Sequence, residues 1–260
     1  MQRFEYYWRL AGTGLSFSLF GIGGIVLSVT LFPLVHLLSS TRTEANHRCQ
    51  YIVHLSFRAF IWSMRSLGIL TYEVAGEEKL RAGGNRLIVA NHPSLIDVVF
   101  IIAMLPRTFC VVKQAAWSNP FMAGVMWATG YIPNDNPVRF IDACVACLAR
   151  GENLVVFPES TRTVPGQPMK LRRGAASIIA KSRRPFVPIA ISSHPTTLTK
   201  AEKWYQIPAC RAHFKITVGD SIDPSPTIIE GEASSLASRR INRLLKSILV
   251  EGVELHASNN

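Results

Sequence analysis

LIVANHPSLIDVVF, residues 87–100, contains the pattern that most clearly indicates the fold of this chain. Residues 87–90 form a short apolar run, which predicts a strand that is buried on both faces. A polar turn containing His92 interrupts the run, and apolar residues then predict a helix over residues 95–105 that Pro106 stops. A buried strand, a turn and a helix in this order are the building unit of an α/β sheet.

The same alternation continues along the rest of the chain. We predict further strands at residues 108–112, 154–157, 186–191 and 214–218, and helices at residues 119–129, 140–149, 174–181 and 233–250. Strands that alternate with helices indicate an α/β fold in which one sheet is flanked by helices. We assign this α/β domain to residues 76–252 and a flexible tail to residues 253–260.

A long uncharged segment precedes this domain. Residues 10–41 contain no Lys, Arg, Asp or Glu, and a helix through them would extend about 48 Å, against roughly 30 Å for the hydrocarbon core of a bilayer. This length exceeds the apolar region of a signal peptide, so we interpret residues 1–48 as a retained membrane anchor. Two arrangements fit: a single tilted span ending near Pro33, or two short helices separated around Gly21, Gly23 and Gly24.

Residues 49–75 are interpreted as an interfacial or linking helix. Between residues 51 and 70, aromatic and apolar residues mix with Arg58 and Arg65, a composition typical of a helix at the membrane interface. A core helix of the α/β domain explains this segment equally well.

The overall composition also favours a membrane protein. Hydrophobic residues make up 48% of the chain, the net charge is +11 and the mean hydropathy is +0.20. A basic surface fits anionic partners such as phospholipid headgroups, whereas the hydrophobic content argues against nucleic acid as a partner. The strongly basic domain favours the cytoplasmic side of the inner membrane.

Five scattered Cys residues argue against a disulfide scaffold. Cys144 and Cys147 form a CxxC pair within an apolar helical stripe, and no second pair follows, so we interpret both as core residues rather than as a redox or zinc site. No metal or other cofactor is expected, because His194 and His213 lie apart with no paired carboxylate.

His92 and Asp97 are the first candidates for chemistry. His92 follows the predicted buried strand, where the sites of α/β sheets form, and Asp97 comes after four intervening residues. A carboxylate that holds one ring N–H of a His leaves the other ring nitrogen to take a proton, so the pair can act as a general base. The alternative is a His in a turn and an Asp on a helix surface, although the residues around Asp97 are apolar.

The segment FPESTR, residues 157–162, follows another predicted strand. Arg162 can hold a phosphate or a carboxylate through its forked donors, and Glu159 can orient that Arg or bind an acceptor hydroxyl. Taken alone, the segment also fits a polar surface turn.

Together these segments resemble the glycerophospholipid acyltransferase family, which includes the bacterial lysophosphatidic acid acyltransferases. NHPSLID is similar to the family motif His, four residues, Asp, and FPESTR is similar to Phe-Pro-Glu-Gly-Thr-Arg. KLRRGA at residues 170–175 and an apolar strand with a central Pro at residues 186–190 follow in the family's order. The resemblance covers residues 76–220 and implies a mixed sheet flanked by helices.

The resemblance also implies a reaction. His92 takes the proton of an acceptor hydroxyl, Asp97 steadies the imidazole, and the hydroxyl oxygen directly attacks the thioester of acyl-CoA or acyl carrier protein. The implied acceptor is a lysophospholipid such as 1-acyl-sn-glycerol 3-phosphate, used in phospholipid biosynthesis. A covalent route through Ser94 or Ser160 is disfavoured because no GxSxG elbow surrounds either, and Ser94 is expected to cap the helix of Asp97.

The residues expected to bind the polar parts of the substrates are Lys113, Gly130, Arg139, Glu159, Ser160, Thr161 and Arg162. Two departures from the family pattern affect this set. Ser160 occupies the position of a family Gly, and Asn136 stands where the family has an Arg that is thought to hold the acceptor phosphate. A neutral amide cannot replace a guanidinium on a phosphate, so either Arg139 substitutes or the acceptor is a different lipid.

Two other functions therefore stay open. One is an acyltransferase for an amino-lipid, a glycolipid or a polyene lipid, which the Asn136 departure favours. The other is a catalytically silent, lipid-binding membrane protein, against which the intact pair of His92 and Asp97 argues.

Overall fold

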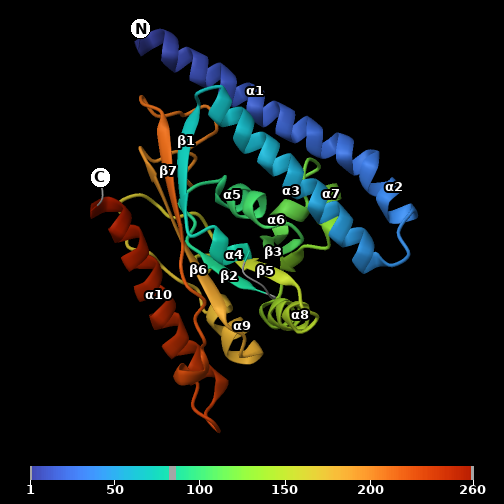
Figure 1. The fold of residues 1–260 in the computed structure, drawn as a ribbon, viewed down its shortest axis with the longest axis vertical. Coiled ribbons are helices and arrows are strands. Elements are labelled where there is room, and N and C mark those ends of the chain that lie inside the picture. The colour runs from blue at the N-terminus through green and yellow to red at the C-terminus, as the bar shows by residue number, and fades with distance from the viewer. Residues whose placement is uncertain (1, 82–85, 259–260) are drawn as a thin grey trace.

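The structure, a computed structural model, describes residues 2–81 and 86–258 and is built around one seven-stranded sheet (Figure 1). The sheet has the order β1-β7-β6-β2-β5-β3-β4. Its strands are β1 (Leu70–Ala75), β2 (Leu87–Ala90), β3 (Thr108–Lys113), β4 (Ile132–Asn134), β5 (Asn153–Val156), β6 (Phe186–His194) and β7 (Ala212–Val218). The five strands from β6 to β4 run parallel, whereas β7 and β1 run the opposite way, which confirms the predicted mixed sheet.

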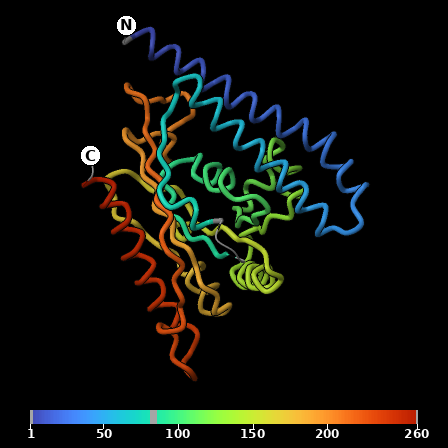
Figure 2. Tube along the Cα trace, viewed as in Figure 1, coloured from blue at the N-terminus to red at the C-terminus, as the bar shows by residue number. Residues whose placement is uncertain are grey.

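Helices cover both faces of the sheet, as the ribbon and the tube show (Figures 1 and 2). One face carries α1 (Gln2–Val29), α2 (Leu31–Leu37), α3 (Arg42–Ser66), α5 (Asp97–Met104), α6 (Gln114–Trp117) and α7 (Ala123–Thr129). The other face carries α8 (Pro137–Ala149), α9 (Gly174–Ser182) and α10 (Ser234–Ser258). Two short helices, α4 (Glu78–Arg81) and the 3-10 helix η1 (Ser225–Thr227), lie in connections.

The position of β2 in the middle of the sheet explains why its four residues are all apolar. Ile88 and Ala90 pack into the core under α3 and α5, whereas Leu87 and Val89 pack into the core under α8, α9 and α10. All four are fully buried, because β2 lies between β5 and β6 with helices on both sides. A strand in this position requires the continuous apolar run that the sequence has there.

Two strands and several boundaries differ from the sequence-based expectation. The sheet begins at β1, Leu70–Ala75, before the boundary expected at residue 76, and β4 was not expected at all. Helix α7 starts at Ala123 rather than at residue 119. Of the flexible tail expected at residues 253–260, residues 253–258 instead continue α10 as far as Ser258, and residues 259–260 lie outside the described part of the chain.

Helix α1 is unbroken at the glycines where a break was one of the two expectations, and the chain bends instead at Thr30, between α1 and α2. The helical run from Arg3 to Leu37 is long and apolar enough to cross a membrane. A Cβ atom on Gly24 would lie 3.1 Å from the carbonyl oxygen of Phe121. Glycine therefore permits close packing of α1 on the segment before α7.

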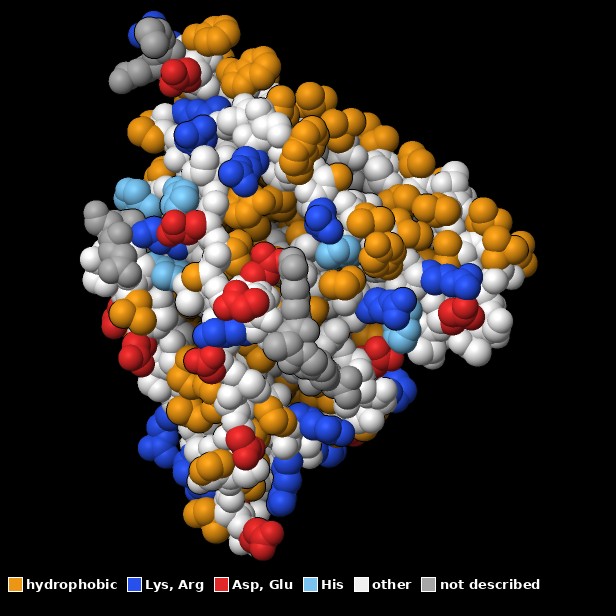
Figure 3. Space-filling view, in the orientation of Figure 1, with side chains coloured by type: hydrophobic (Ala, Val, Ile, Leu, Met, Phe, Trp, Pro, Cys, Tyr) orange, Lys and Arg blue, Asp and Glu red, His pale blue; other side chains and the backbone are white. Residues whose placement is uncertain are grey.

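The two faces of α1 differ sharply. Small or polar residues such as Gly12, Thr13 and Ser16 are buried against the domain. The other face exposes large apolar side chains to solvent, which form the band of hydrophobic surface along α1 and α2 in Figure 3; they include Phe4, Tyr7, Leu15, Leu19, Ile22, Val26, Val29, Leu34 and Leu37. We call this band the apolar ridge.

Helix α3 returns antiparallel beside α1 and α2 and packs on α5 (Figure 1). It buries one face containing Cys49, Val53, Phe60 and Ile61 in the core of the α/β domain. Its opposite face exposes Trp62. Of the two explanations for this segment, the core helix accounts for the buried face.

Candidate functional site

The carboxyl end of β2 is where His92 leaves the sheet. Asn91 is buried, and its side chain donates to the carbonyl oxygen of Ile191 in β6 and accepts from the N–H of the same residue, both at 2.7 Å. This side chain continues the pairing of β2 with β6 where the backbone of β2 stops. The backbone of His92 is therefore free to turn away from the sheet.

His92 and Asp97 are in contact. Nδ1 of His92 lies 2.9 Å from Oδ2 of Asp97, so Asp97 accepts from the protonated Nδ1. Asp97 is completely buried, whereas 19% of the His92 side chain is exposed. Within the described part of the chain, Nε2 of His92 has no hydrogen-bond partner. The imidazole thus presents its unprotonated nitrogen outward, as a general base requires.

The environment of Asp97 affects its protonation. Burial raises the pKa of the Asp97 carboxyl, and hydrogen bonds from His92 and from the N–H of Ser94 oppose that rise. The N–H of Ser94 donates to Oδ2 of Asp97 at 2.7 Å. The expectation that the Ser94 hydroxyl caps α5 is wrong, because Ile96 is the N-cap of α5 and the Ser94 hydroxyl is buried without a partner among the described residues.

The turn after β5 holds the backbone of His92 in place. Oε1 of Glu159 accepts from the N–H of His92 at 2.8 Å, and the N–H of Thr163 donates to the carbonyl oxygen of His92 at 2.7 Å. The hydroxyl of Thr163 donates to Oε2 of Glu159 at 2.8 Å. Glu159 therefore makes its bonds to His92 and Thr163, and not to Arg162 as one hypothesis supposed. Burial raises the pKa of Glu159, and these hydrogen bonds lower it.

Two residues at this site were missed in the sequence. Thr163 follows the FPESTR segment directly, and that position was the available signal. The ring of Phe157 stacks on the imidazole of His92, with centroids 4.4 Å apart. Phe157 was quoted only as part of the motif, and the stacking gives it a role in fixing the imidazole plane.

Ser160 adopts a left-handed backbone with a φ of 56°. L-amino acids other than Asn and Asp rarely adopt this conformation, whereas Gly adopts it without a steric penalty. The turn requires a positive φ at this position, which explains why the family has Gly there. Thr161, next to Ser160, is partly buried in the same turn.

Arg162 lies partly buried beside the loop that follows β6, residues 195–211. Its Nη1 donates to the carbonyl oxygens of Leu198 and Thr199, both at 2.8 Å. Lys113 ends β3 at the same edge of the sheet, with its side chain exposed. Partial desolvation and then the charges of Lys200 and Arg162 lower the pKa of Lys113.

The segment around Asn136 connects α7 to α8 and caps the start of α8. Gly130 ends α7 in a left-handed conformation with a φ of 67°. Asn136 is the N-cap of α8, and its side-chain oxygen accepts from the N–H groups of Val138 at 3.0 Å and Arg139 at 3.1 Å. The side chain of Arg139 is exposed on the first turn of α8. Asn136 thus caps a helix, which an Arg at this position cannot do.

The other polar candidates lie elsewhere. Cys144 and Cys147 of α8 are free thiols that are fully buried in the hydrophobic core beneath this helix. Burial raises the pKa of Cys147 to about 12. His194 and His213 do not lie apart, because they are register partners across β6 and β7, and Glu73 approaches Nε2 of His213 at 3.8 Å. The antiparallel pairing of those strands brings the two residues together.

Comparison with known proteins supports the resemblance. Residues 71–192 match the acyltransferase family. The chain is similar to the 1-acyl-sn-glycerol-3-phosphate acyltransferase of Helicobacter pylori, with 29% identity over 159 residues that cover 56% of this chain and 65% of that protein. It is also similar to the human alpha enzyme of the same name, at 24% identity over 70% of this chain and 65% of that protein.

A third relative is the chloroplastic 1-acyl-sn-glycerol-3-phosphate acyltransferase BAT2 of Brassica napus, at 26% identity over 64% of this chain and 48% of that protein. The chain spans about half to two thirds of the length of these curated relatives. The crystal structure of the 1-acyl-sn-glycerophosphate acyltransferase PlsC from Thermotoga maritima has a TM-score of 0.73 and 17% identity over 99% of this chain and 98% of that one. At this identity the likeness shows the same fold.

Proposed function

We propose that this chain, whose residues 71–192 match the acyltransferase family, transfers a fatty acyl group from a thioester to the free hydroxyl of 1-acyl-sn-glycerol 3-phosphate. The observation that carries this proposal is the buried Asp97 on Nδ1 of His92, which leaves Nε2 of an accessible imidazole unprotonated. The names of the curated relatives favour this acceptor.

The proposed reaction has two steps. Nε2 of His92 takes the proton of the acceptor hydroxyl as its oxygen attacks the thioester carbonyl carbon, and Asp97 stabilises the imidazolium that forms. The tetrahedral intermediate then collapses, the C–S bond breaks, and the leaving thiolate takes the proton back from His92. The products are the diacylated lipid and a free thiol, and His92 returns to its starting state.

The donor is acyl-CoA or acyl carrier protein, and the polar groups of the two substrates meet the cations at the carboxyl edge of the sheet. Arg162 and Lys113 are the proposed contacts for phosphate. Ser160 and Thr161 belong to the same turn as Arg162, while Glu159 positions His92. Gly130 ends α7 before the amino end of β4, next to Asn46 of α3, and therefore takes no part in this phosphate contact. Arg139 lies on the exposed first turn of α8, which follows β4, the strand beside Lys113.

The test uses purified protein with 1-acyl-sn-glycerol 3-phosphate and either acyl-CoA or acyl carrier protein loaded with the same fatty acid. Release of free thiol and formation of phosphatidic acid, followed by mass, are expected with at least one donor. Neither product with either donor would refute the proposed function. Thiol release with no phosphatidic acid would identify hydrolysis instead of transfer.

A second candidate acceptor follows from Asn136. Because this residue caps α8, the phosphate-binding Arg of the family is absent from that position, and an amino-lipid, glycolipid or polyene lipid needs no such Arg. Offering these lysolipids in the same assay separates the two acceptors by product mass. A catalytically silent lipid-binding protein would release no thiol with any of them.

We further propose that the apolar ridge attaches the enzyme to the inner membrane from the cytoplasmic side. Helix α1 packs on α3 and α7, so it lies along the domain instead of projecting from it. An exposed band of large apolar side chains is costly in water and is typical of a membrane-contact surface. The double substitution Leu19→Glu with Ile22→Glu should release the protein from vesicles, whereas the control Leu236→Glu on α10 should not. Equal retention of wild type, the double variant and Leu236→Glu on vesicles would refute the attachment.

A further inference from the structure

The loop after β6, residues 195–211, is held against the site from two sides. The carbonyl oxygen of Leu198 accepts from Nη1 of Arg162 at 2.8 Å and from the N–H of Leu95 at 3.1 Å. Leu95 lies between His92 and Asp97, so one carbonyl group joins this loop to both polar segments of the site. Thr199 adds its own carbonyl to Nη1 of Arg162.

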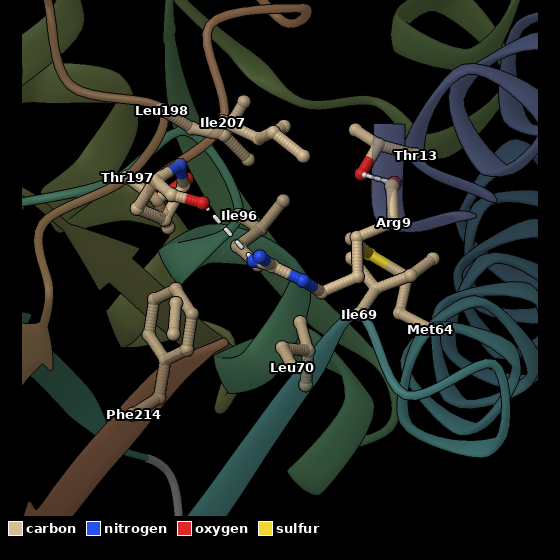
Figure 4. Close-up of a pocket in the computed structure, with 12 residues that line it drawn as sticks. Arg9, Thr13, Met64, Ile69, Leu70, Ile96, Thr197, Leu198, Ile207 and Phe214 are labelled. Atoms are coloured by element: carbon tan, nitrogen blue, oxygen red, sulfur yellow. Dashed lines mark hydrogen bonds between the residues drawn. The ribbon is translucent and has the colours of Figure 1, made fainter. Parts of the chain in front are cut away.

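The far end of this loop is fixed by α1. Nη1 of Arg9 donates to the carbonyl oxygen of Pro208 at 3.0 Å, and its Nη2 donates to that of Ala209 at 2.5 Å. Arg9 is only 7% exposed and projects from α1 across a small apolar pocket toward Thr197 and Leu198 (Figure 4). A buried guanidinium that binds two carbonyl groups holds a loop in one conformation.

Lys200 lies in the part of this loop that Arg162 holds. It directly follows Thr199, whose carbonyl oxygen is bound by Arg162, and its side chain is exposed. The N–H of Thr199 donates to Oε2 of Glu202 at 2.8 Å, which fixes the backbone on that side of Lys200. The charge of Lys200 also acts on Lys113 at the end of β3. The loop contact of Arg162 with Thr199 therefore brings the backbone of Lys200 next to the segment that carries Arg162.

The donors of Arg162 are divided between the loop and the site. Nη1 is occupied by the two carbonyl groups, whereas Nε and Nη2 have no hydrogen-bond partner in residues 2–81 and 86–258. An N–H pair of this kind binds two oxygens of a phosphate side by side. A second cation next to such a pair would neutralise the remaining charge of a phosphate monoester.

We propose that Lys200 binds a phosphate group of the substrate together with Arg162 and Lys113, and so replaces the Arg that is absent at Asn136. This proposal rests on the proposed function and deepens it by naming the residue that recognises the anionic headgroup. Phosphate occurs in the acceptor headgroup and in coenzyme A, so the recognised chemistry is the phosphate ester, and the experiment separates its two sources.

The test compares Lys200→Ala and Lys200→Arg with wild type, and uses Lys203→Ala as the matched control. Lys203 lies on the same loop, but its Nζ sits 5.7 Å from the ring centroid of Tyr205. Lys200→Ala is expected to raise the KM for the substrate whose phosphate Lys200 binds about tenfold, because it removes one charge-assisted hydrogen bond at an accessible site. The kcat should be nearly unchanged. Lys200→Arg and Lys203→Ala should stay within about twofold of wild type.

Two KM values identify the source of the phosphate. A rise in the KM for 1-acyl-sn-glycerol 3-phosphate places the acceptor headgroup at Lys200, and a rise in the KM for acyl-CoA places the coenzyme there. Unchanged values for both substrates in Lys200→Ala overturn the proposal. So does an equal rise in Lys203→Ala, which would indicate a general effect of surface charge.

Binding of sn-glycerol 3-phosphate, measured by calorimetry, separates failure of this proposal from failure of the proposed function. If wild type transfers no acyl group but binds sn-glycerol 3-phosphate, and Lys200→Ala loses that binding, Lys200 holds phosphate and the proposed reaction is wrong. If wild type forms phosphatidic acid and Lys200→Ala binds and reacts equally well, the reaction stands and the role of Lys200 is refuted.

Discussion

The backbone N–H of His92 donates to Oε1 of Glu159 at 2.8 Å, although the two residues come from different connections of the sheet. The carbonyl oxygen of His92 accepts from Thr163, which in turn donates its hydroxyl to Glu159. The position of the proposed base is therefore set by the turn after β5 as well as by the strand that precedes it. The turn that carries His92 and the turn that carries Glu159 are therefore joined by hydrogen bonds.

Removing the Glu159 carboxylate should misplace His92. Glu159→Ala leaves the N–H of His92 and the hydroxyl of Thr163 without their acceptor, so we expect kcat to fall about 100-fold, as small displacements of a catalytic group do. Glu159→Gln keeps an oxygen for His92 and should retain most of the activity. Steady-state kinetics of both variants test this, and wild-type kcat in Glu159→Ala would show that the contact does not position His92.

Asp97→Asn should separate activity from stability. Burial raises the pKa of Asp97 above its ordinary 3.8, so at pH values between 3.8 and that raised pKa the folded state holds a proton that the unfolded state releases, and above it Asp97 is the carboxylate that accepts from His92. The contribution of Asp97 to the free energy of unfolding is then present below pH 3.8 and declines as pH rises above about 4. Relative to wild type, Asp97→Asn should become more stable as pH rises, while kcat falls on the order of 1,000-fold or more because the imidazole loses its charged partner.

Denaturant titrations of both proteins between about pH 4 and pH 7 measure the difference in free energy of unfolding. A constant difference over that range would show that Asp97 has the same pKa in the folded and unfolded states. Retained kcat in Asp97→Asn would remove the carboxylate from the mechanism.

Ser160→Gly should stabilise the protein. Ser160 has a φ of 56°, so glycine relieves a steric penalty of about 1 kcal/mol that exceeds the extra entropy it gains on unfolding. The Tm is expected to rise slightly with kcat unchanged, and Ser160→Ala, which keeps the strain, serves as the control. A lower Tm for Ser160→Gly than for Ser160→Ala would mean that the hydroxyl contributes more than the backbone strain costs.

Asn136→Ala should cost about 1 kcal/mol, the usual value for loss of an N-cap, whereas Asn136→Asp should keep the cap on Val138 and Arg139. Thermal unfolding compares the three proteins. The KM for 1-acyl-sn-glycerol 3-phosphate should be unchanged in Asn136→Ala, because this side chain faces its own helix. A raised KM with an unchanged Tm would instead give Asn136 a role in the acceptor site.

Strong local patterns made much of this fold predictable. The apolar run of β2, the Gly174 start of α9 and the Pro106 stop after α5 are each determined by neighbouring residues, and the structure has them where expected. Strand β4 was missed because it has three residues and contains Pro133, which is confined to edge positions such as this one. Strand β1 was missed because its alternating, half-exposed pattern follows directly on a helix.

The site was predictable where one motif contains both partners. His92 and Asp97 are five residues apart and meet across a single turn. The contact of Glu159 with His92 joins residues 67 positions apart, and the loop of Lys200, which contacts Arg162 through Leu198 and Thr199, carries no motif. Such contacts depend on the order of strands in the sheet, which no local pattern specifies. The expected cap by Ser94 failed because α5 begins only at Asp97 with Ile96 as its N-cap, so Ser94 precedes the capping position.

Acyl transfer by His92→Ala tests directly whether His92 is the catalytic base, and His213→Ala on β7 is the control, a His substitution outside the site. The two variants are incorporated into vesicles and supplied with 1-acyl-sn-glycerol 3-phosphate and acyl thioester, and thiol release and phosphatidic acid are followed together. We predict that His92→Ala loses at least about 1,000-fold in kcat while it still binds vesicles, and that His213→Ala stays near wild type. Acyl transfer by His92→Ala at the rate of His213→Ala would contradict the account.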